Sequence, residues 1–201
     1  MKSITKRLIR LMFVVMAMMH FGQADACTNI AVGRKATKDG SVLATYCVDG
    51  FARSETLHYV PHATHTVGAM RKIYNWEDKN SYMGEIPEVA ETWNVVGNTN
   101  EWQLTITETT CPGLNEMHDP TAIIDYGSLI YITLERAKTA REAIRTMTEL
   151  VEKYGLFCQG ETFTIADPDE MWLMFMNSCG SDRVKSPERN VWAVSAYLTT
   201  P

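Results

Sequence analysis

The chain contains 201 residues, 45% of them hydrophobic, which is enough apolar material for one domain with a substantial core. Nothing in this composition indicates intrinsic disorder. Acidic residues outnumber basic ones by 24 to 19, and the resulting formal net charge of −5 argues against nucleic acid as a partner.

Residues 1–26 have the pattern of a secretory signal peptide. Four basic residues lie within the first ten, an apolar run follows over 11–19, and Ala24-Asp25-Ala26 supplies a small-x-small cleavage triplet. The run is too short to remain as a membrane anchor, and no other stretch approaches the length of a span. We therefore expect residues 1–26 to be removed and residues 27–201 to form an exported domain, periplasmic or extracellular.

Cleavage after Ala26 would make Cys27 the first residue of the mature chain. A thiol and a free α-amine would then belong to one residue. An α-amine has a pKa of about 7.7–8.0, far below that of lysine, so it can accept a proton at neutral pH. Such an amine can activate its own side chain as a nucleophile. The sequence therefore predicts that maturation creates a catalytic thiol.

The same cysteine could instead carry a lipid and anchor a surface protein. Bacterial lipoproteins prefer a large aliphatic residue three positions before the modified cysteine, whereas this chain has Ala24 there. Lipidation would block the amine and abolish the mechanism. The other cysteines lack metal-ligand spacing, so no zinc site is expected, and we interpret them as structural: Cys47, Cys111, Cys158 and Cys179.

The first half of the mature chain predicts two hairpins. Strands over 29–34 and 41–49 flank the turn Lys38-Asp39-Gly40, and strands over 92–97 and 103–109 flank a turn at 98–101. Between them, residues 57–60 favour a strand, residues 73–87 look irregular, and three histidines surround Pro61. The spacing of these histidines is irregular and no carboxylate accompanies them, so a solvated loop is favoured over a metal site.

Helical periodicity follows, and strands then return. Residues 124–134 form a strongly apolar helix, and Thr139-Ala140-Arg141-Glu142 is a capping box that opens a second helix ending at Gly155. Strands are predicted over 162–166, 170–176 and 191–197, the middle one apolar on both faces and therefore internal. This order predicts an α+β fold, with helices packed on antiparallel sheets in a layered sandwich.

Short motifs recur in a defined order along the mature chain, from Cys27 to about Val194. They are Cys27-Thr28-Asn29, Lys38-Asp39-Gly40-Ser41, Tyr46-Cys47-Val48-Asp49, the stretches 94–101 and 124–129, and Ile165-Ala166-Asp167-Pro168. In these motifs the chain resembles the PepD-like dipeptidases, cysteine peptidases of the N-terminal-nucleophile hydrolase superfamily. Penicillin acylases and bile-salt hydrolases are more distant relatives.

The resemblance implies an αββα four-layer sandwich that hydrolyses amide bonds of short peptides without a cofactor or metal. Cys27 would be the nucleophile and its α-amine the proton acceptor and donor. Asp49 would orient the N-terminal residue, and the side-chain amide of Asn100 would donate to the oxyanion. Without the resemblance, both residues can also be interpreted as ordinary turn residues. Asp49 precedes Gly50, and Asn100 lies at the tip of a predicted hairpin.

Two features depart from the family pattern. Many relatives carry an Arg-Asn pair where this chain has Tyr46-Cys47, so an arginine that would lower the thiol pKa is absent there. Relatives also continue well beyond this length, so we expect the domain to be truncated at its C-terminus. A non-catalytic surface lipoprotein or decayed peptidase is therefore an alternative, and an acylase acting on non-peptide amides is a second one.

Overall fold

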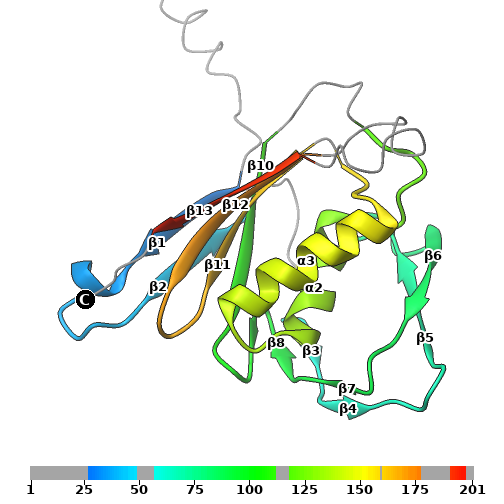
Figure 1. Ribbon diagram of the computed structural model, residues 1–201, viewed down its shortest axis with the longest axis horizontal. Helices are drawn as coiled ribbons and strands as arrows, with labels where there is room; N and C mark the ends of the chain where they lie inside the picture. Colours follow the sequence, from blue (N-terminus) through cyan, green and yellow to red (C-terminus); the bar gives the residue numbers. More distant parts are fainter. Residues whose placement is uncertain (1–26, 49–56, 112–117, 159, 178–190, 198–201) are drawn as a thin grey trace, which may run out of the picture.

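Antiparallel strands and two adjacent helices make up the computed structural model, which describes residues 27–48, 57–111, 118–158 and 160–177 and the backbone of 191–197 (Figure 1). The main sheet of this described part has seven strands in the order β13-β12-β11-β10-β9-β8-β3. These strands are β3 (Tyr59–Val60), β8 (Val95–Val96), β9 (Thr99–Asn100), β10 (Thr105–Thr110), β11 (Gly160–Ala166), β12 (Met171–Asn177) and β13 (Val191–Tyr197).

Helices α2 (Tyr126–Arg136) and α3 (Ala140–Tyr154) begin and end where the sequence predicts, to within two residues. Thr139 Oγ1 accepts a hydrogen bond from the Glu142 backbone N–H at 3.2 Å, as expected for a capping box. The carboxylate of Glu142 accepts from the N–H of Lys138. At the other end Gly155 has φ 76°, a conformation that favours glycine, and this ends α3.

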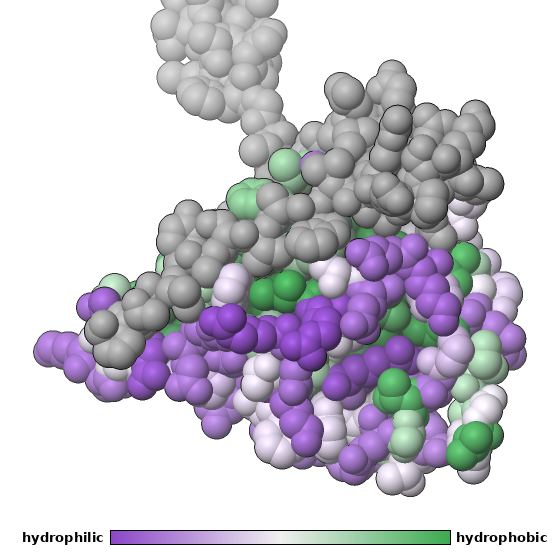
Figure 2. All heavy atoms as spheres, in the orientation of Figure 1, coloured by the Kyte–Doolittle hydropathy of each residue, from purple (hydrophilic) through white to green (hydrophobic). Residues whose placement is uncertain are grey.

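The hydrophobic core lies between these helices and the main sheet. Leu129 and Ile132 of α2 and Met147 of α3 are fully buried, as are Phe163 and Ile165 of β11. The polar face of α3 is turned outward, and hydrophilic side chains cover the middle of the molecular face shown in Figure 2. The helix pair therefore covers one face of the sheet.

The N-terminal hairpin lies on the other face. It consists of β1 (Thr28–Val32) and β2 (Leu43–Cys47), joined through a 3-10 turn at Arg34–Ala36. A cavity between hairpin and sheet is lined by Asn29 and by Thr162 and Thr164 of β11. Because side chains alternate along a strand, these threonines point away from Phe163 and Ile165. The described residues thus form three layers: hairpin, main sheet and helices (Figure 1).

The predicted second hairpin is wrong in detail. Residues 91–110 form β7 (Glu91–Thr92), β8, β9 and β10, and β9 lies where a turn was expected. Two tight turns make this possible, since Gly97 has φ 56° and Gln103 has φ 63°. The chain can therefore reverse twice within a segment whose alternation resembles one hairpin.

The prediction of irregular structure over 73–87 is also wrong. Strands β5 (Met70–Tyr74) and β6 (Tyr82–Pro87) form a separate hairpin, and β4 (Ala63–Thr64) pairs with β7. Ile73 and Ile86 are the buried residues of the β5–β6 hairpin, while most of its other side chains are polar or exposed. With only one buried apolar residue in each strand, the alternation of apolar and polar residues is too weak to predict strands from the sequence.

The predicted α+β class is confirmed by this arrangement. The αββα four-layer sandwich stays a prediction, because the described part contains only one helical layer. No helix among the described residues is both long enough and apolar enough to cross a membrane. The expected signal peptide, residues 1–26, lies outside that part of the chain.

Candidate active site

Cys27 lies immediately before β1, half-buried against the main sheet. Its thiol donates a hydrogen bond from Sγ to Oε1 of Glu108, over 3.2 Å. Glu108 belongs to β10 and is 2% exposed. The thiol of the predicted nucleophile is therefore paired with a deeply buried carboxyl group.

Two neighbours fix this contact. The phenol of Tyr46, on β2, donates to the same Oε1 of Glu108 at 2.5 Å. The side-chain amide of Asn29, on β1, donates to the backbone carbonyl of Glu108 at 2.7 Å and to Thr109 Oγ1 at 2.5 Å. Both strands of the hairpin thus bind the middle of β10, and this holds Cys27 and Tyr46 over Glu108.

A second carboxyl group, Glu161 of β11, lies beside Glu108 and is 3% exposed. Burial, the charge of Glu108 and a hydrogen bond with Glu108 together raise the pKa of Glu161 to about 9, and burial is the largest of these causes. Glu161 therefore keeps its proton at neutral pH. Burial is also the main cause that raises the pKa values of the Tyr46 phenol and the Cys158 thiol, with Glu108 adding to both. The surroundings of Glu108 are neutral proton donors.

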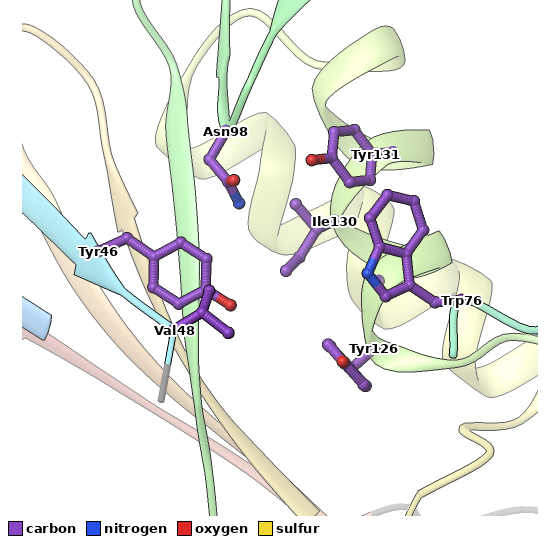
Figure 3. A pocket seen from close by; sticks show the side chains of 8 residues that line it. Tyr46, Val48, Trp76, Asn98, Tyr126, Ile130 and Tyr131 are labelled. Atoms are coloured by element: carbon purple, nitrogen blue, oxygen red, sulfur yellow. The ribbon is translucent and has the colours of Figure 1, made fainter. Parts of the chain in front are cut away.

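An aromatic cavity of about 260 Å³ adjoins this group. Figure 3 shows Tyr46 and Val48 on one side of it, facing Trp76, Tyr126 and Tyr131 on the other, with the amide of Asn98 between. Ile130 and Gly127 complete the lining. Because Tyr46 both lines the cavity and shares the Glu108 oxygen with Cys27, the cavity begins one side chain away from the thiol.

The helix terminus shapes the far wall of this cavity. Asp125 caps α2 by accepting from the N–H of Ser128, and its other oxygen accepts from the N–H of Trp76 at 2.5 Å. Gly127 then allows the indole to lie against the helix, since a Cβ at that position would be 2.2 Å from Trp76 Cγ. Trp76 also stacks on Tyr131 with 4.6 Å between ring centroids. The wall is therefore a fixed aromatic surface.

Asn100 is placed away from the thiol contact and serves the backbone. Its amide nitrogen donates to the carbonyls of Leu134 and Ala137, at 2.8 and 2.7 Å, and its oxygen accepts from the N–H groups of Trp102 and Leu104. Both of its N–H hydrogens are thus engaged in holding the end of α2 to the turn after β9. The role of Asn100 as an oxyanion donor stays a prediction. In this structure both hydrogens of its amide are already donated to backbone carbonyls.

Asp49, the predicted orienting residue, lies outside the described residues. Glu108, Glu161 and the contact of Tyr46 with Glu108 were not predicted from the sequence. Glu108 sits in the threonine-rich strand Thr105-Ile106-Thr107-Glu108-Thr109-Thr110, with the same parity as the buried Ile106. A charged residue on the inward face of a strand is the signal that could have identified it.

The predicted loop histidines do not gather into a ligand set. His58 packs on the Tyr131 ring at 4.3 Å between centroids, His62 contacts Glu91 and Glu101, and His65 bonds Thr92. Among the described residues no group of three or more histidine, cysteine, aspartate or glutamate side chains could hold a metal ion. These histidines are parts of separate local contacts.

The structure holds a cysteine against a buried carboxyl group, close to an aromatic cavity. This arrangement is a candidate active site for an enzyme that uses a cysteine thiol. The chain belongs to peptidase family C69, whose sequence model matches residues 26–184. This confirms the resemblance to the PepD-like dipeptidases. The match begins one residue before Cys27.

Curated relatives agree with this assignment. The chain is 25% identical over 174 residues to the probable dipeptidase B of Streptococcus pyogenes serotype M1, and to the proteins of that name from two strains of serotype M3. The alignment covers 74% of this chain but 32% of the relative. This chain therefore corresponds to about a third of those proteins.

Proposed function

We propose that the chain provides the nucleophile-bearing part of an exported cysteine dipeptidase. The observation that carries this proposal is the position of Cys27: its thiol lies 3.2 Å from Glu108, and only the Tyr46 side chain separates this contact from an aromatic cavity. Membership of peptidase family C69 supports peptide hydrolysis, and the similarity to proteins named probable dipeptidase B supports dipeptides as substrates. The pattern of residues 1–26 supports export.

Leader removal would release the α-amine of Cys27, which then accepts the thiol proton. The sulfur attacks the carbonyl carbon of the peptide, and a tetrahedral intermediate forms. When the C–N bond breaks, the proton passes to the leaving amine and a thioester remains on Sγ. Water, deprotonated by the same α-amine, then cleaves the C–S bond, releasing the carboxylic acid and restoring the thiol.

The aromatic cavity would receive a side chain of the substrate. Its volume of about 260 Å³ lies just below the range of pockets that enclose a whole drug-sized ligand, roughly 300–1,000 Å³. Its lining is mostly aromatic, with the Asn98 amide as a polar exception. This favours an apolar or aromatic residue on the acyl side of the scissile bond.

The test combines processing, labelling and hydrolysis. Intact mass and N-terminal sequencing of the exported protein should give a chain that begins at Cys27. Iodoacetamide should label Cys27, and Cys27→Ser should lower dipeptide hydrolysis by at least about 10³-fold, because the thiolate is the reacting group. Cys111→Ser, which removes an exposed thiol outside the proposed site, is the matched control and should retain activity.

Other results would favour the alternatives. A lipid-sized mass increment on Cys27 would contradict the peptidase and indicate a surface lipoprotein. Hydrolysis of acyl amides in preference to dipeptides would indicate an acylase. A correct N-terminus with labelling but without hydrolysis of either substrate class would indicate a decayed homologue or a need for the remaining part of the relatives' length.

A further inference from the structure

Glu108 and Glu161 are buried without a positive charge. Their exposed fractions are 2% and 3%, and neither takes part in any ion pair between described residues. The Oε2 atoms of both carboxyl groups are buried and accept no hydrogen bond. The contacts of Glu108 Oε1 come from a thiol and a phenol, and Glu108 also shares a hydrogen bond with the protonated Glu161, so all of its partners are neutral.

Such an arrangement is costly unless a cation completes it. An ionised carboxylate removed from water loses several kcal/mol of solvation, which only a close opposite charge and hydrogen bonds can offset. Elsewhere among the described residues, the buried Glu135 is paired with Arg71, and the half-buried Glu88 is paired with Arg136. The missing element beside Glu108 is therefore a donor with positive charge.

We infer that Glu108 and Glu161 form a binding site for a primary ammonium group. An ammonium group is a compact point charge with three N–H donors, and it can bond the unpartnered Oε2 atoms. The donor set fits a metal ion less well, since the described residues hold no group of three or more metal-ligating side chains. This inference rests on the proposed function for the source of the ammonium group.

Two sources can supply the ammonium group that would bind Glu108 and Glu161. The first is Cys27 itself, whose α-nitrogen is separated from Sγ by only two carbon atoms. Before cleavage this nitrogen is a neutral amide, and cleavage would turn it into an ammonium group beside Glu108. The second source is the substrate, because a dipeptide whose first carbonyl meets Sγ carries its own α-ammonium group one carbon away from that carbonyl.

The first experiment measures the α-amine and does not depend on activity. The pH dependence of α-amine acetylation by acetic anhydride is followed by peptide mass in the processed Cys27→Ser chain, in which the first residue carries no thiol. If Cys27 supplies the group, its α-amine pKa should lie about one unit or more above the ordinary 7.7–8.0, since a carboxylate stabilises the charged form. Adding Glu108→Gln should return it to that range, whereas Glu85→Gln, an exposed glutamate on β6, should not.

The second experiment measures binding of leucyl-leucine and N-acetyl-leucyl-leucine to the Cys27→Ser chain by calorimetry. If the substrate supplies the group, the free dipeptide should bind about tenfold or more tightly, and Glu108→Gln should abolish this preference. Glu85→Gln again serves as the control. Binding is measured without turnover, so an inactive wild-type enzyme would contradict the proposed function and leave this comparison intact.

A raised α-amine pKa identifies Cys27 as the source, and a preference for the free dipeptide identifies the substrate. An ordinary α-amine pKa together with equal binding of the two peptides overturns the ammonium site. Both measurements are decisive even if Glu108→Gln fails to fold, because they compare the parent chain with a reference pKa and one ligand with another.

Discussion

Two acidic pairs among the described residues have side chains largely shielded from solvent, and they differ in how their charge is balanced. Glu88 and Glu135 lie near the end of α2 and are held by two arginines. Arg71 binds both oxygens of Glu135, with Nη2 to Oε1 at 2.7 Å, and Arg136 binds Glu88 at 2.8 Å. Glu108 and Glu161 lie beside Cys27 with neutral donors only.

The difference appears in the protonation of the two pairs. Burial alone would raise the pKa of Glu88, but the Val89 N–H and Arg136 lower it below its ordinary value overall. Burial and Glu108 act in the same direction on Glu161 and raise its pKa to about 9. The carboxylates that are paired with arginines stabilise the fold. The pair beside Cys27 has no cationic partner among the described residues, and we interpret it as a ligand-binding site.

The largest effect is expected from removing an arginine of the compensated pair. Arg71→Met should lower the free energy of unfolding by about 3–5 kcal/mol, because it leaves the carboxylate of Glu135, with a side chain 5% exposed, without its partner. Urea denaturation measures this change. Arg34→Met breaks an exposed pair with Asp169 and should cost less than about 1 kcal/mol. Equal effects of the two variants would contradict the comparison.

Asn100→Ala should destabilise the fold by about 3 kcal/mol, since it orphans two carbonyls and two N–H groups in a buried turn. Asn98→Ala, which removes a single amide-to-carbonyl bond to Ile106, is the matched control and should cost about 1 kcal/mol. An unchanged free energy with kcat lowered about 10²–10³-fold would instead support the oxyanion role. Denaturation of both variants and the kinetics of Asn100→Ala decide between the two roles.

The uncompensated pair should make stability depend on pH. The folded-state pKa of Glu161 is about 9 against 4.5 when unfolded, so the native state keeps a proton that the unfolded state loses between these values. The stability of the unprocessed chain should therefore fall as pH rises from 4.5 to 9, by up to about 1.4 kcal/mol per pH unit. Glu161→Gln should remove this slope, which denaturation at pH 6 and pH 8 measures. A slope that persists in the variant would contradict it.

Much of this fold could be predicted from the sequence because its elements carry local signals. The periodicity of α2, the Thr139 cap and Gly155 at the end of α3 are read within a few neighbouring residues. The β5–β6 hairpin was missed because it buries one isoleucine per strand. Cys27 could be found from the cleavage triplet before it, but its partner Glu108 is 81 positions away, and no local pattern encodes that contact. The oxyanion role of Asn100 came from a family resemblance and stays a prediction, while its observed hydrogen bonds depend on where α2 ends.

The smallest effect concerns the donor that Tyr46 provides to the uncompensated pair. Tyr46→Phe removes the 2.5 Å hydrogen bond to Glu108 Oε1 and leaves that oxygen with the thiol of Cys27, a weak donor. Because hydrogen bonds to charged groups contribute about 1.5–3 kcal/mol, the variant should lose about 1.5 kcal/mol at pH 7. Tyr82→Phe, an exposed tyrosine on β6, should change stability by less than about 0.5 kcal/mol.

A double-mutant cycle then shows whether the loss depends on the charge of Glu108. If the phenol stabilises an ionised carboxylate, Tyr46→Phe should cost about 1 kcal/mol less in a Glu108→Gln background than in the parent chain. A coupling energy near zero would mean that Glu108 is neutral in the folded chain. The carboxyl groups beside Cys27 would then need no cation. They would differ from the arginine-bound pair only in being protonated, and the ammonium site would lose its support.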